Sequence, residues 1–168
     1  RGTRIQFKPD TEIFETAEFQ YDTIARRLRE LAFLNSGTKI ILSSEVDGRE
    51  GTFFYENGIA EFVQYLNEGK KTIHDDVIHI QAAHDGTEIA IALQFNDGYN
   101  ETVFCFANNI NPVDGGTHLS GFRSALTRTL NNYGREKNQY KDLTPQGEDY
   151  REGLTAVLSV KLPNPQFE

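Results

Sequence analysis

Residues 114–123 read Asp114-Gly115-Gly116-Thr117-His118-Leu119-Ser120-Gly121-Phe122-Arg123 and open a regular amphipathic segment. From there, apolar side chains recur every three or four residues, at Leu119, Phe122, Leu126, Leu130 and Tyr133. This spacing predicts a long helix with one buried stripe, because positions three and four apart share a helical face. The two glycines permit a tight turn before the helix, and Thr117 is expected to cap its first turn.

The other side of this predicted helix is polar and locally basic. Arg123, Thr127 and Asn131 fall on one stripe, each four residues after the last, and Arg128 lies beside it. The stripe has two interpretations. It is either an ordinary solvated helix face or an arginine lining for a phosphate backbone, which requires cations but no base-specific geometry.

Composition limits the class of protein. A chain of 168 residues is one domain or a small pair, and 38% hydrophobic with 25% charged residues is typical of soluble globular proteins. No apolar run approaches the roughly 20 residues of a membrane helix, so no membrane contact is expected. The net charge of −8 argues against general polyanion binding. Any contact with nucleic acid must therefore be confined to a local patch of cations.

The residues offer no catalytic, cofactor or metal centre. The one cysteine, Cys105, excludes an internal disulfide and suits a reducing compartment. Because Phe104 and Phe106 flank it in a predicted strand, we expect a packed structural thiol. The four histidines lack metal-ligand spacing, and the glycine-rich stretch lacks a P-loop lysine.

Periodicity and turn residues predict an α+β order of elements. A short strand around Ile5 and Phe7 precedes a helix that begins near Asp22 and stops at Asn35-Ser36-Gly37. A hairpin over 39–55 follows, and then a short helix after Asn57-Gly58 that turns Ile59, Phe62, Val63 and Leu66 inward and ends at Gly69. Strands over 77–83, 87–95 and 101–107 come next, and we expect them to form an antiparallel meander. After the long helix we expect a mobile loop over 134–143, a short helix beginning at Thr144-Pro145, and a final strand over 154–162.

Several long blocks make the chain similar to a known family. The segment Asn108-Asn109-Ile110-Asn111, followed by residues 114–131, resembles the DNA gyrase B family of type IIA topoisomerases. Further matching blocks are residues 27–35, 58–67, 96–99, 151–156 and 163–167. The resemblance implies that residues 1–56 are the last strands and helix of a GHKL ATP-binding domain. Residues 57–168 would be a transducer domain of the ribosomal-S5-like fold, a mixed sheet with packed helices.

The resemblance also implies a role. In the family, the transducer relays ATP-driven clamp closure to DNA strand passage, and its inner face lines the DNA cavity. Arg123 matches a basic residue that faces this cavity, and Arg128 is added by its proximity on the helix. The implied partners are duplex DNA, the gyrase A subunit and a second B subunit on clamp closure, in the cytoplasm.

The resemblance places the family's ATP and Mg²⁺ sites outside this chain. The chain begins at Arg1 without a methionine and stops before the family's Gln-Thr-Lys loop, so we expect it to hold no cofactor and to be inactive alone, although the holoenzyme is an ATP-hydrolysing topoisomerase. Two alternatives stay open. One is the equivalent topoisomerase IV subunit, and the other is a stand-alone S5-like module that binds nucleic acid or protein.

Overall fold

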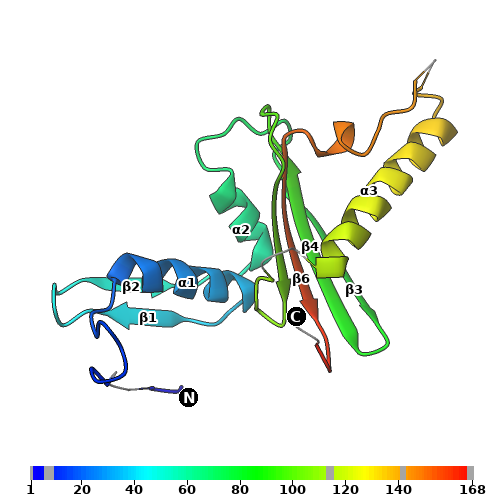
Figure 1. Cartoon of the computed structure of the whole chain (residues 1–168). Helices are drawn as coiled ribbons and strands as arrows, with labels where there is room; N and C mark the ends of the chain where they lie inside the picture. Colours follow the sequence, from blue (N-terminus) through cyan, green and yellow to red (C-terminus); the bar gives the residue numbers. More distant parts are fainter. Residues whose placement is uncertain (1, 6–9, 113–115, 141–142, 166–168) are drawn as a thin grey trace.

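The computed structural model describes residues 2–5, 10–112, 116–140 and 143–165 (Figure 1). The α-helices are α1 (Tyr21–Leu34), α2 (Ile59–Leu66) and α3 (Gly116–Glu136), and a 3-10 turn, η1, spans Asp149–Arg151. The strands are β1 (Ile40–Ser43), β2 (Glu50–Phe53), β3 (Ile78–His84), β4 (Thr87–Phe95), β5 (Thr102–Ala107) and β6 (Leu154–Lys161). The predicted α+β fold with helices on a mixed sheet is confirmed. No described helix combines the length and apolar content needed to cross a membrane.

The main sheet has the order β3-β4-β6-β5, which corrects the predicted meander. β3 and β4 pair antiparallel as expected, but β6 lies between β4 and β5 and pairs parallel with β5. Residues 154–160 of β6 are all buried, so both of its faces need a covering layer and it occupies a central position. Parallel neighbours require a crossover connection, which α3 provides between β5 and β6.

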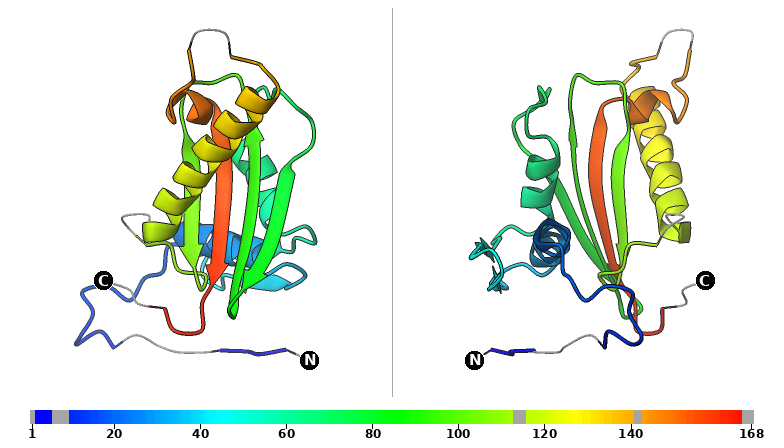
Figure 2. Two further views of the ribbon diagram at one scale, coloured as in Figure 1. Left: turned by 90° about the vertical axis from the view of Figure 1, so that its right-hand side faces the viewer. Right: turned by 60° about the vertical axis from the view of Figure 1, so that its left-hand side comes forward.

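Helices cover both faces of this sheet (Figure 2). On one face, α1 and α2 pack Phe33, Phe62 and Val63 against a cluster that includes Phe106 and Val157. On the other face, α3 packs on a second cluster of sheet residues. The members of that cluster, with the α3 side chains that join it, are Leu93, Cys105, Leu154, Ala156, Leu158, Leu119, Phe122 and Leu126. The sheet therefore separates α3 from α1 and α2.

The first core runs across the expected boundary between residues 56 and 57. The Phe33 ring stacks on Tyr55 at 3.7 Å and on Phe62 at 4.7 Å between centroids. The Arg27 Nη2 donates to the Asn109 carbonyl oxygen at 2.8 Å, and the Asn109 side chain donates to that of Asn35 at 3.1 Å. The α1 helix thus packs on α2 and on the loop after β5, and the small β1–β2 hairpin packs on α1.

Some local predictions were wrong. Residues 2–5 form no strand and Ile5 is exposed, while Phe7 lies outside the described residues. Thr117 lies inside α3 rather than at its cap, since the helix begins at Gly116. Tyr133 is exposed, and the last turns of α3 lean away from the sheet (Figure 1).

The expected loop over 134–143 is also corrected in part. α3 continues to Glu136, and Tyr140 then folds back onto Gly134 and donates to the Leu130 carbonyl oxygen at 3.1 Å. Lys141 and Asp142 lie outside the described residues. The helix expected from Thr144-Pro145 is reduced to the 3-10 turn η1, at whose start the Asp149 carboxylate accepts from the Gln146 amide at 2.6 Å.

Candidate nucleic-acid interface

Arg123 projects from the second turn of α3 and is held by an acid from another element. Its Nε and Nη2 donate to Oε1 and Oε2 of Glu101, both at 2.9 Å. Such a fork uses one edge of the planar guanidinium and fixes its orientation. The Arg123 side chain nevertheless remains 40% exposed, whereas that of Glu101 is 21% exposed. The carboxylate is therefore the more buried partner, and within the described part of the chain Nη1 of Arg123 makes no hydrogen bond.

A second arginine shares this carboxylate. Arg151 at the end of η1 places its Nε 3.3 Å from the Glu101 Oε2, and its side chain is 19% exposed. The Nε has no hydrogen bond among the described residues, so this is a charge contact rather than a directed bond. Two cations around one carboxylate leave the cluster of Arg123, Glu101 and Arg151 with a formal charge of +1.

The rest of the predicted polar stripe is not an open face. The Asn131 Oδ1 accepts from the Tyr150 hydroxyl at 2.7 Å, and the Tyr150 hydroxyl also bonds that of Tyr140. The Thr127 hydroxyl donates to the Arg123 carbonyl oxygen at 2.9 Å, and the side chain lies against Gly147. Residues 145–151 thus cover Thr127 and Asn131, and this part of the stripe attaches that segment to α3. Thr127 and Asn131 therefore form neither a solvated face nor a phosphate contact, because the chain itself covers them.

Arg128 is an open cation of the helix, and Arg135 in the last turn is another exposed one. Arg128 is exposed, and its guanidinium has no ion pair or hydrogen bond within the described part of the chain. His118, at the start of α3, adds no charge at neutral pH, since burial lowers its pKa below the ordinary 6.5. Among the described residues, the cations that α3 can offer to a polyanion are therefore Arg123, Arg128 and Arg135.

This arrangement suits phosphate contacts better than catalysis. A guanidinium with a free edge donates well to phosphate oxygens. Among the residues that the structure describes, no group of three or more histidine, cysteine or acidic side chains is placed to hold a metal ion. Cys105 is buried, and desolvation raises its pKa to about 11, which fits the predicted structural thiol.

Sequence reasoning missed Glu101 and Arg151. Glu101 was placed only at the start of a strand, and Arg151 only near the end of a short helix. They lie 22 and 28 residues from Arg123, and no periodicity links them, so a local pattern carries no signal for this cluster.

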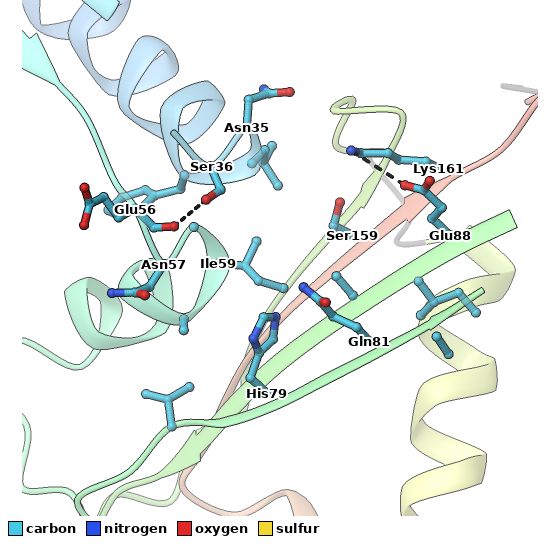
Figure 3. A pocket seen from close by; sticks show the side chains of 18 of the residues that line it. Asn35, Ser36, Glu56, Asn57, Ile59, His79, Gln81, Glu88, Ser159 and Lys161 are labelled. Atoms are coloured by element: carbon cyan, nitrogen blue, oxygen red, sulfur yellow. Dashed lines mark hydrogen bonds and ion pairs between the residues drawn. The ribbon is translucent and has the colours of Figure 1, made fainter. Parts of the chain in front are cut away.

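Sequence reasoning also missed a crevice of about 1180 Å³ on the far side of the sheet. It lies between the end of α1, the start of α2 and strands β3 and β4, with His79 and Gln81 on its floor (Figure 3). Lys161 at its rim pairs loosely with Glu88 at 3.9 Å. The crevice is polar and wide and lies away from α3, so it does not belong to the cation face.

Comparison with known proteins agrees with the resemblance found in the sequence. The family model described as DNA gyrase B matches residues 58–168. The chain belongs to the DNA gyrase B family. The gyrase B subunit of Myxococcus xanthus is 54% identical over 170 residues, covering 100% of this chain and 21% of that protein. The Clostridium acetobutylicum subunit is 53% identical and covers 99% of this chain, which spans 27% of its length.

Solved structures give the same family. The 43K ATPase domain of Thermus thermophilus gyrase B, solved with an aminocoumarin, matches with a TM-score of 0.84 and 41% identity, covering 96% of this chain and 45% of that one. A topoisomerase IV ATP-binding domain from Francisella tularensis matches with a TM-score of 0.76 at 19% identity, which shows the shared fold alone. The chain thus spans about a quarter of the curated gyrase B subunits and about half of the solved ATPase domain.

Proposed function

We propose that this chain is the section of a gyrase B subunit that couples ATP-driven clamp closure to DNA strand passage in negative supercoiling. The observation that carries the proposal is the end-to-end similarity to gyrase B subunits at more than 50% identity. The enzyme as a whole would be an ATP-hydrolysing DNA topoisomerase of the cytoplasm. Its partners would be duplex DNA, the gyrase A subunit and a second B subunit. ATP and Mg²⁺ would bind outside the present chain.

Within this role, residues 1–56 would be the end of the ATP-binding domain and residues 57–168 the transducer. The packing of Phe33 on Phe62 supports mechanical coupling between these two parts, because movement of α1 cannot leave α2 unaffected. The topoisomerase IV alternative has weaker support, since the similarity to that protein is one of fold.

We assign the DNA contact to Arg123 and Arg128 on α3. The Arg123 side chain is 40% exposed and that of Arg128 is exposed, and both belong to the helix that packs on β5 and β6. Contacts of this kind bind the phosphate backbone without reading sequence, and they weaken with salt. A duplex moving past the helix would therefore be held loosely and without sequence preference.

Arg123→Gln and Arg128→Gln in the full-length subunit, assembled with gyrase A, test this assignment. The measured quantity is the ratio of DNA-stimulated to basal ATP turnover. We expect each substitution to lower the ratio several-fold, because each removes one phosphate contact. Arg26→Gln is the matched control, since Arg26 is an exposed arginine on α1, across the sheet from α3. An unchanged ratio in both α3 variants would remove DNA binding from this face.

A further inference from the structure

We propose that Glu101 is a positioning residue for the DNA contact. Its carboxylate holds Arg123 and Arg151 together, so that the free edge of Arg123 is presented to a phosphate. The proposal rests on the DNA-binding role assigned to α3. It assigns to an acidic residue a favourable effect on polyanion binding, the reverse of what its charge alone would produce.

The geometry indicates that Glu101 supports Arg123 and does not compete with a phosphate for it. Both Glu101 oxygens contact Arg123 along the inner Nε–Nη2 edge, and the acid is less exposed than the arginine it holds. Because the carboxylate occupies Nε and Nη2, a phosphate can bond Nη1 without displacing it. Without this pair, Arg123 would have to be ordered by the ligand itself, at a cost in side-chain entropy.

The backbone that carries Glu101 is itself anchored. Asn96 is buried at the end of β4, where its Oδ1 accepts from the Gly98 amide at 2.9 Å. The Asn96 amide donates to the Gly153 carbonyl oxygen at 2.9 Å, and the Asp97 amide to that of Lys71 at 2.9 Å. The turn before β5 is therefore tied to the start of β6 and to the segment after α2. Glu101 leaves this turn at a fixed place beneath α3.

Arg151 keeps the cluster cationic. If Glu101 met Arg123 alone, the pair would be neutral and would attract a phosphate weakly. The 3.3 Å contact from Arg151 restores a formal charge of +1 at the same point. Arg151 follows Tyr150, which is bonded to Asn131 of α3, so it is held close to the helix. The cluster thus combines a fixed orientation with a net positive charge.

The test measures the DNA concentration that half-maximally stimulates ATP turnover by the full-length subunit with gyrase A, using linear duplex DNA across a salt series. Arg123→Gln should raise this concentration about five-fold and lower the salt slope by about one unit. Glu101→Gln should also raise it, by roughly two- to five-fold. Glu136→Gln is the charge-matched control, since Glu136 is an exposed acid at the end of α3, the helix that carries Arg123. It should leave the concentration unchanged or lower it, because it only removes a negative charge.

The double variant separates positioning from general stability. If Glu101 acts through Arg123, adding Glu101→Gln to Arg123→Gln should change the half-maximal concentration little further. Glu101→Asp keeps the charge and should recover part of the effect, and thermal melting of each variant checks that folding is retained.

The outcomes distinguish the two proposals. If Arg123→Gln weakens the response to DNA but Glu101→Gln strengthens it or leaves it unchanged, Glu101 is a competing charge and the positioning role is wrong. If Arg123→Gln has no effect, the DNA face on α3 fails and the positioning role fails with it. A full additional loss from Glu101→Gln in the Arg123→Gln background would also overturn the proposal.

Discussion

Cys105 illustrates how burial sets the chemistry of one side chain. Its thiol lies in the cluster between β5 and α3, and desolvation raises its pKa to about 11. Only the thiolate reacts readily with disulfide reagents. The residue should therefore be inert in the folded protein although free thiols are usually reactive.

We expect native Cys105 to react with a disulfide reagent such as DTNB at pH 8 far more slowly than an exposed cysteine. The pH lies about three units below its pKa, so roughly one thiol in a thousand is ionised, and access is blocked as well. The release of the coloured thiolate measures the rate. In strong denaturant the same residue should react within seconds to minutes. A rapid reaction in the native protein would contradict the packing described here.

At the scale of elements, the entry into β6 depends on one glycine. Gly153 has a φ of +68°, and a Cβ at this position would overlap the Asn96 carbonyl oxygen and lie 2.8 Å from that of Gly98. The same residue accepts a hydrogen bond from the Asn96 amide. This close backbone approach joins β4, the turn before β5 and β6.

Gly153→Ala should lower the free energy of unfolding by about 3 kcal/mol, through backbone strain and the clash together. Gly37→Ala is the matched control, because Gly37 also has a positive φ, of +76°, but has open space around its Cβ position. It should cost about 1 kcal/mol from the left-handed conformation alone. Urea unfolding curves measure both values. Equal costs would show that the Asn96 contact is looser than described.

At the scale of the whole molecule, the aromatic stack around Phe33 unites the parts before and after residue 56. Phe33 is buried between Tyr55 and Phe62, and the core it joins includes Phe106 and Val157 of the main sheet. A core shared in this way favours one cooperative unit, although the division at residues 56 and 57 stays a prediction.

Phe33→Ala should lower the free energy of unfolding by about 3–5 kcal/mol, because it opens a cavity in this shared core. Phe54→Ala, which truncates a half-exposed ring nearby, should cost much less. Circular dichroism and tyrosine fluorescence should report the same unfolding midpoint in the unsubstituted chain. Two separate midpoints would mean that residues 1–56 unfold independently.

The sequence alone determined most of the helices and strands, the burial of Cys105 and the family. These properties depend on local spacing. Buried side chains recur every three to four residues in a helix and every two residues in a strand. The β4 strand has the predicted bounds for this reason, and the α2 helix buries Ile59, Phe62 and Val63 as predicted. The resemblance in long blocks also needs no knowledge of the fold.

Only the tertiary structure decided which strands are neighbours and which charges meet. The alternation of residues in β6 predicts a strand but does not predict that it lies between β4 and β5. The hydrophobic period of a strand is the same whichever strands it pairs with. Arg123 has no acid four residues away in the chain, yet Glu101 reaches it from the turn just before β5. Contacts between residues far apart in sequence depend on how the whole sheet is ordered, and local spacing does not encode that order.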